Sequence, residues 1–208
     1  MNDIVKLSEL VSTRLSHDIA GQIGAIFNST ELMEECPEMM EQAVELLSFT
    51  SKELMARIRF FRLAYGLSSE NNDADLAQLK EIAENFLENK KVQLQWDLQD
   101  NISPYLGKIV LLLISSVADS LLKGGEIKIS TDKNMSAEGI GVQKTLIEAK
   151  GDIIKFNPEI TEAILGNKDI SEIDSKSLPA YMIFLLARKI GQNIDLKIND
   201  TKIEITVG

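Results

Sequence analysis

The chain has 208 residues, of which 44% are hydrophobic and 26% charged, so it is long and apolar enough to bury a core. Its net charge of -10 argues against a general nucleic-acid binder or a protein that binds anionic membranes. With a single cysteine, Cys36, and a single histidine, an internal disulfide is excluded and a structural zinc or multi-histidine metal centre is disfavoured. We therefore expect no metal site and a reducing, cytoplasmic location.

Residues 1–68 predict two long helices joined near Pro37. Apolar side chains recur at helical spacing, first at Ile4, Leu7, Val11, Leu15, Ile19, Ile23 and Ile26, and again from Met40 to Tyr65. Pro37 suits the first turn of the second helix, because the N–H that proline lacks would have no partner there. Gly66 and the polar run after it end the second helix. Two such helices form an antiparallel hairpin.

A single hairpin leaves its apolar stripe in need of a partner. A second copy of the chain would complete a four-helix bundle with two-fold symmetry, and we expect this homodimer. The alternative is that the stripe packs on the second half of the same chain.

Residues 73–208 alternate helical and strand patterns. Asp73 or Asp75 can cap a helix that runs to about Lys91, and further helices are expected at 104–122 and 176–190, with a short one from Pro158. Strands are expected at 92–98, 126–131, 143–149, 195–198 and 202–207, with 152–156 as a further candidate. Helices set apart from an antiparallel or mixed sheet make an α+β sandwich. The most apolar stretches, 109–116 and 181–187, are shorter than the roughly 18 residues of a membrane span, so we expect buried helices and no membrane segment.

The only histidine, His17, is two residues from Leu15 and two from Ile19, which turns it away from the apolar stripe and toward solvent. Gly21, Gly24 and Asn28 follow it at the spacing of one helical face. Because each glycine costs a helix roughly 0.8–1 kcal/mol relative to alanine, we expect this smooth face to be a docking surface for a partner protein. The alternatives are an incidental surface histidine and glycines that pack inside the bundle.

An imidazole can act as a nucleophile and carry a covalent intermediate near neutral pH. Asp18 follows His17 directly and could orient its ring. Arg14, three residues before His17, could meet phosphate oxygens with its planar guanidinium. Equal rise along both helices sets His17 level with about Ala56 and Arg57, so Arg57 is a further candidate for phosphate or partner contact. A solvated charged face is the alternative for Arg57 and its basic neighbours.

The run STRLSHDIAGQIGAI at 12–26 resembles the phosphoacceptor helix of dimeric histidine phosphotransferases of the ChpT type, relatives of the sensor histidine kinases that lost kinase activity. The run RFFRLAYG at 59–66 is similar to the second-helix signature of the same family, and residues 178–191 are similar as well. Gln22 departs from the family pattern, because the family usually has proline at this position. The difference bears on a kink of the helix below His17 and not on the acceptor role of His17.

The resemblance implies a bundle (1–68) that dimerises and accepts phosphoryl on His17, with Asp18 as its adjacent acid, followed by a degenerate version of the kinase ATP-binding fold (73–208). In such families phosphoryl passes from a receiver-domain aspartate to the histidine and then to another receiver, and the receiver supplies the Mg²⁺. We therefore expect a histidine phosphotransferase of a two-component phosphorelay, with response-regulator receivers as partners and no cofactor of its own. The alternative is a non-catalytic homodimeric module that docks and sequesters receivers.

An ATP-dependent kinase is a further hypothesis. The ATP-binding fold of the sensor kinases needs an asparagine-bearing helix for Mg²⁺ and an Asp-x-Gly-x-Gly segment for adenine. The corresponding helix here reads LISSVADS at 113–120 and lacks asparagine, and the only Gly-x-Gly, at 139–141, has no preceding acid in the required place. We therefore expect no ATP binding.

Overall fold

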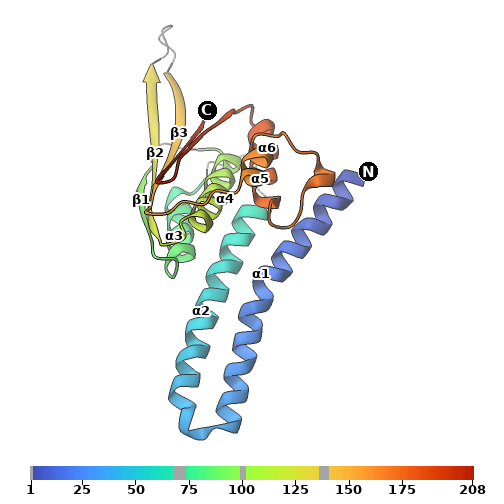
Figure 1. Cartoon of the computed structure of the whole chain (residues 1–208), viewed down its shortest axis with the longest axis vertical. Helices are drawn as coiled ribbons and strands as arrows, with labels where there is room; N and C mark the ends of the chain where they lie inside the picture. The colour runs from blue at the N-terminus through green and yellow to red at the C-terminus, as the bar shows by residue number, and fades with distance from the viewer. Residues whose placement is uncertain (1, 68–73, 99–101, 136–140) are drawn as a thin grey trace.

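Two long helices form an antiparallel hairpin that projects from the rest of the molecule (Figure 1). The computed structural model describes residues 2–67, 74–98, 102–135 and 141–208. Helix α1 (Asn2–Glu35) and helix α2 (Met40–Tyr65) are joined by the short 3-10 helix η1 (Pro37–Met39), which begins at Pro37. Gly66 follows the last residue of α2. The predicted boundary between the two parts of the chain, 68–73, lies outside the described residues.

The described residues between 74 and 208 form an α+β sandwich, called the sandwich below. Its helices are α3 (Leu76–Leu87), α4 (Pro104–Ser120), α5 (Pro158–Ile164), the 3-10 helix η2 (Ile170–Glu172) and α6 (Leu178–Lys189). Its strands are β1 (Val92–Asp97), β2 (Gly125–Met135), β3 (Gly141–Lys150), β4 (Ile194–Ile198) and β5 (Lys202–Val207), in the spatial order β1-β2-β3-β5-β4. β1 and β2 are parallel and the other pairs antiparallel. This mixed sheet confirms the predicted fold class.

Short polar side chains begin three of the sandwich helices. Asp75 accepts a hydrogen bond from the Gln78 N–H at 3.0 Å, and Ser103 Oγ accepts one from the Leu106 N–H at 3.1 Å. Asn157 does the same at the start of α5. Each cap satisfies a backbone donor that the first helical turn leaves without a partner.

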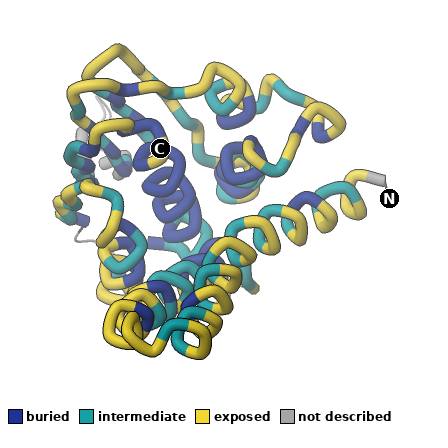
Figure 2. Tube along the Cα trace, turned by 60° about the horizontal axis from the view of Figure 1, so that its bottom comes forward, coloured by how far each residue is buried: buried dark blue, intermediate teal, exposed yellow. Residues whose placement is uncertain are grey.

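Helix α4 lies at the centre of the core, and every residue from Gly107 to Ala118 is buried. Alternate strand residues such as Ile127, Ile147 and Ile205 belong to the same core, while their neighbours on the strands form a charged outer face. Figure 2 shows the buried residues gathered in the sandwich, with the hairpin mostly exposed or half-buried. Within the described ranges, no helix is both long and apolar enough to span a membrane.

Three predicted elements differ from the structure. The strand predicted at 126–131 is longer, because β2 runs from Gly125 to Met135. Residues 152–156 form no strand and make only a single bridge, between Ile154 and Leu121. β3 already pairs with β2 and β5, so the segment after β3 finds no free edge beside it. The helix predicted at 75–91 ends at Leu87, and the turn that follows places Lys91 at a φ of 54°.

The apolar stripe of the hairpin is covered over part of its length. Leu10 is buried against the sandwich, and Leu7, Val11, Leu15 and Ile19 pack partly against the same core. Farther along the hairpin, Ile23 is 54% and Phe27 is 60% exposed on α1, and Val44, Met55 and Ile58 are exposed on α2. Packing on the same chain therefore covers the stripe from Leu7 to Ile19, whereas Ile4 and the part of the hairpin beyond Ile19 are largely uncovered in the single chain.

Candidate functional site

His17 stands in the middle of α1 with 84% of its side chain exposed. Its ring Nδ1 lies 3.4 Å from Oδ1 of Asp18, longer than a usual N–H···O hydrogen bond. A carboxylate oxygen only accepts, so this contact favours the tautomer that carries its proton on Nδ1. Nε2 is then left with its lone pair, which is the state of a nucleophile.

Asp18 is shared between His17 and Arg14. Oδ2 of Asp18 lies 2.6 Å from Nε of Arg14, and the two side chains are only 12% and 21% exposed. Arg14 therefore turns toward Asp18 and into the hairpin, and its predicted contact with phosphate oxygens stays a prediction. Its i,i+4 spacing from Asp18 brings the two side chains together on one side of the helix.

A second link joins the two helices next to His17. With its amide oriented as its neighbours require, Gln22 donates to the backbone oxygen of Asp18 at 2.7 Å and accepts from Nε of Arg57 at 3.1 Å. Arg57 thus lies level with the turn that follows His17, close to where equal helical rise placed it. Because Gln22 keeps the backbone N–H that proline would lack, α1 runs unbroken through this position.

A small cavity of about 30 Å³ lies between the hairpin and the sandwich, behind the Arg14–Asp18 pair. From the hairpin it is lined by Arg14, Asp18, Arg57 and Tyr65, and from the sandwich by Lys90, Ser115, Asp119 and Pro179. Lys90 Nζ donates to Oδ1 of Asp119 at 2.6 Å. Burial raises the pKa of the Tyr65 hydroxyl above its ordinary value, with Arg14 lowering it and Asp18 raising it. Tyr65 is therefore a neutral phenol beside the ion pair.

Gly21, Gly24 and Asn28 are exposed on the same helical face as His17. A Cβ atom built at Gly21 or at Gly24 would meet nothing within 4 Å. Neither glycine therefore packs against another part of its own chain, and the face around His17 is open.

The comparisons with known proteins decide the family. Residues 76–202 match the family described as the histidine phosphotransferase C-terminal domain, which is more than half of the chain. The chain belongs to the histidine phosphotransferase family. The protein phosphotransferase ChpT of Brucella abortus (strain 2308) is 29% identical over 193 residues, 91% of this chain and 89% of that protein. The solved structure of a bacterial phosphotransferase has the same fold, with a TM-score of 0.85 at 24% identity over 98% of this chain and 96% of that one.

Family membership confirms the resemblance to ChpT-type proteins that residues 12–26 and 59–66 indicate. It also supports histidine phosphotransfer in a phosphorelay as the class of activity of this phosphotransferase.

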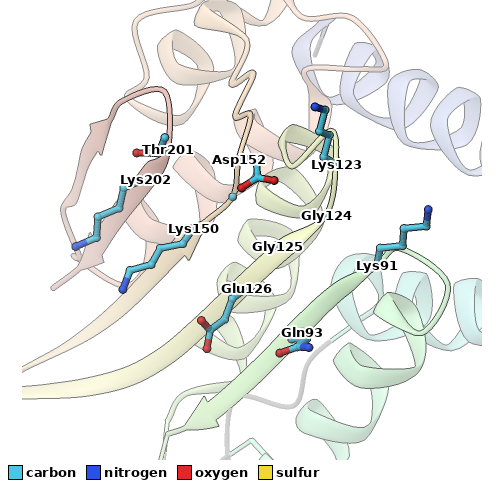
Figure 3. A pocket seen from close by; sticks show the side chains of 11 residues that line it. Lys91, Gln93, Lys123, Gly124, Gly125, Glu126, Lys150, Asp152, Thr201 and Lys202 are labelled. Carbon is cyan, nitrogen blue, oxygen red and sulfur yellow. The ribbon is translucent and has the colours of Figure 1, made fainter.

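A larger cavity of this phosphotransferase, of about 850 Å³, opens where β1 and β2 begin (Figure 3). Lys91, Lys123, Lys150 and Lys202 line it, but Lys150 and Lys202 point to one side and Lys91 to another. The backbone N–H groups of Gly124, Gly125 and Gly151 already donate to carbonyl groups. The cavity therefore has no convergent set of donors for an anion, and it contains none of the predicted site residues.

Sequence reasoning assigned no role to several residues around His17. The sequence marks Gln22 only as a departure from the family, and Tyr65 only as the end of the apolar pattern and part of a signature. The Arg14–Asp18 pair had a signal, the i,i+4 spacing of opposite charges, whereas Lys90 and Asp119 are 29 residues apart and share no local pattern. Among the residues that the structure describes, no group of three His, Cys, Asp or Glu side chains is arranged to hold a metal ion.

Proposed function

We propose that this phosphotransferase relays a phosphoryl group between receiver-domain aspartates of a bacterial two-component phosphorelay, with Nε2 of His17 as the acceptor atom. The observation that carries the proposal is the exposed imidazole of the only histidine, whose Nδ1 is held by Asp18 at 3.4 Å. A group that must reach into a partner's active site has to be exposed, and a group that must attack has to be oriented. His17 meets both needs.

In the proposed step, the lone pair of Nε2 attacks the phosphorus of an aspartyl phosphate on the receiver. The N–P bond forms as the P–O bond to the aspartate breaks, and the aspartate carboxylate leaves with the bonding pair. The ring becomes cationic and keeps its proton on Nδ1, where the Asp18 carboxylate stabilises the charge. The reverse sequence passes the phosphoryl group to a second receiver. The Mg²⁺ that assists the transfer is the receiver's.

The open face of α1 is the proposed docking surface for the receiver. Gly21, Gly24 and Asn28 extend it from His17 toward the tip of the hairpin, and the two glycines leave room for a partner helix to come close. Arg57 lies beside this turn but is engaged by Gln22.

The proposed active form is a homodimer. The uncovered apolar side chains Ile23, Phe27, Val44, Met55 and Ile58 lie on both helices of the hairpin. A second hairpin would bury them in a four-helix bundle, as the sequence pattern predicts.

ATP is not part of the proposed reaction. Helix α4 corresponds to the Mg²⁺-holding helix of the kinase fold, has no asparagine in 113–120, and is buried from Gly107 to Ala118. We propose that the sandwich has a structural and docking role, and that the protein acts in the cytoplasm, where receiver domains are found.

The experiment is a transfer assay with a phosphorylated receiver domain as the only phosphate source. The expected result is phosphate on this protein that is stable in alkali and labile in acid, as a phosphoramidate is, and that a second receiver removes. Receiver binding without covalent phosphate would instead identify the protein as a non-catalytic docking module.

A further inference from the structure

We propose that Arg14 is a positioning residue for His17: it holds Asp18 so that the ring proton stays on Nδ1 and Nε2 stays a nucleophile. The inference rests on the proposed function, in which His17 accepts the phosphoryl group. It gives Arg14 a role in the chemistry that needs no contact with phosphate or with the receiver.

The geometry of Asp18 is the first support. One of its oxygens, Oδ2, is 2.6 Å from Nε of Arg14, and the other, Oδ1, is 3.4 Å from Nδ1 of His17. Nε of Arg14 makes no aligned hydrogen bond, so the link is the attraction of two close opposite charges, which draws Oδ2 of Asp18 inward and leaves Oδ1 to face His17. Because 84% of the His17 side chain is exposed, packing does little to orient its ring. The orientation of the ring therefore depends on Asp18, and that of Asp18 depends on Arg14.

The burial of the pair is the second support. Arg14 and Asp18 are 21% and 12% exposed, and the cavity of about 30 Å³ behind them is closed on the far side by residues of the sandwich. An ion pair is stronger in such surroundings than in water, because the effective dielectric constant is lower. Arg14 thus lies on the inner side of Asp18, while the side chain of His17 is exposed to solvent.

The other groups around Asp18 give it no equivalent cation. The charged and titratable groups that face it are Arg14 and His17 on α1, Arg57 and Tyr65 on α2, and Lys90 and Asp119 on the sandwich. Arg57 is engaged by Gln22, and Lys90 by Asp119. Without Arg14, Asp18 would be a largely buried carboxylate with no short ion pair, and its side chain would be free to turn. Nδ1 of His17 would then lose its acceptor, and the ring proton would spend more time on Nε2, which removes the attacking lone pair.

The test uses the fact that the chain has one histidine, so imidazole labelled with ¹⁵N gives the signals of a single ring. In the wild-type protein at a pH where the ring is neutral, the ¹⁵N shifts should report mainly the Nδ1–H tautomer. In Arg14→Gln the tautomer balance should move toward Nε2–H, and transfer from a phosphorylated receiver to His17 should slow by about 10- to 100-fold. Arg14→Lys keeps the positive charge, so this variant should retain most of the wild-type tautomer balance and most of the wild-type transfer rate.

The matched control is Arg59→Gln, the same change on the other helix. Arg59 makes an exposed ion pair with Glu81 at 3.9 Å, so its loss should change neither the tautomer balance nor the transfer rate. Unchanged ¹⁵N shifts in Arg14→Gln would overturn the proposal. Weaker receiver binding with normal shifts would overturn it too, because Arg14 would then be a contact residue.

A double variant covers the case in which Arg14→Gln does not fold because Asp18 is left as a buried, unpaired charge. Asp18→Asn and the double variant Arg14→Gln/Asp18→Asn carry no such charge and should transfer at equal rates, because Arg14 acts through Asp18. A further loss of rate in the double variant would contradict the proposal. The tautomer measurement needs no phosphate, so it tests the role of Arg14 independently of the transfer assay. If the wild-type protein accepted no phosphate in that assay, the result would count against the proposed function instead.

Discussion

Phe60 on α2 and Phe86 on α3 stack with ring centroids 4.1 Å apart and an interplanar angle of 22°. Phe61 meets the edge of Phe60 at 6.0 Å, and the ammonium group of Lys90 lies 5.1 Å from the centre of the Phe86 ring. These rings join the hairpin to the sandwich and line the cavity behind the Arg14–Asp18 pair. The placement of the sandwich and the surroundings of the His17 turn are therefore coupled.

Replacing Phe60 should weaken the whole fold. Phe60 is 1% exposed, and Phe60→Ala should lower the free energy of unfolding by about 3–5 kcal/mol through lost burial and the cavity that remains. Chemical denaturation measures this change. Phe49→Ala, on the same helix but with a ring that is 49% exposed, is the control and should cost much less. Equal losses in the two variants would mean that the stack contributes little.

His17→Ala should abolish phosphate acceptance and leave the fold almost unchanged. The side chain is exposed, so the free energy of unfolding should change by no more than about 0.5 kcal/mol. Acid-labile phosphate is measured after incubation with a phosphorylated receiver, and unfolding is followed by circular dichroism. Glu31→Gln, an exposed change on the same helix, should leave both properties as they are. Phosphate on the His17→Ala protein would show that the acceptor is another residue.

Gly21→Leu and Gly24→Leu should impair receiver binding without unfolding the hairpin. Leucine favours a helix more than glycine, and a Cβ atom at either position meets nothing within 4 Å, so stability should hold or rise. The new side chains occupy the space of the partner helix, which should weaken receiver affinity about tenfold or more. A binding titration and sedimentation measure the two effects. Loss of the dimer would instead assign the glycines to packing between copies, and normal affinity with normal transfer would remove them from the docking surface.

The purified protein should neither bind nor hydrolyse ATP at physiological concentrations. Helix α4 lacks the asparagine that holds Mg²⁺ in the kinase fold, and its residues from Gly107 to Ala118 are buried. Isothermal titration with MgATP is the direct measurement, with a nucleotide-binding kinase as the positive control. A saturable signal in the micromolar range would restore the kinase hypothesis.

The stability of α6 should depend on pH through Asp174. Burial raises the pKa of this carboxyl, but hydrogen bonds from the Ser177 hydroxyl at 2.6 Å and from the backbone N–H groups of Ser177 and Lys176 outweigh it, so its pKa is below the ordinary 3.8. A pKa lowered by folding means that the ionised form stabilises the folded state, fully above about pH 3.8 and less as the pH falls further.

Asp174→Asn should therefore be less stable than the wild-type protein at pH 7, by about 0.5–1.5 kcal/mol, because hydrogen bonds to the turn before α6 are weakened. The difference should shrink below about pH 3.8, which denaturation at several pH values measures. The exposed Asp195→Asn serves as the control. A difference that stays constant through the acid range would contradict the assignment to Asp174.

The positions of the long helices and the exposure of His17 could be predicted from the sequence, because interactions between residues close together in the chain decide them. The helical spacing of apolar side chains and the position of Pro37 place α1 and α2, and side chains such as Asp75 begin helices through contacts with the next turn. The exposure of His17 follows from its place on the helix opposite the apolar stripe, and the open face at Gly21 and Gly24 follows from the same periodicity.

The tertiary structure alone decided how these parts meet. The sequence spacing allowed Arg14 to reach toward His17 or toward Asp18, and the structure turns it inward to Asp18. Residues 152–156 have a strand pattern, but β2 and β5 occupy both sides of β3, so the segment has no edge to join. The Lys90–Asp119 pair and the Phe60–Phe86 stack bring together residues far apart in the chain. Such contacts depend on which surfaces the whole fold buries, and no pattern along a single helix or strand carries that information.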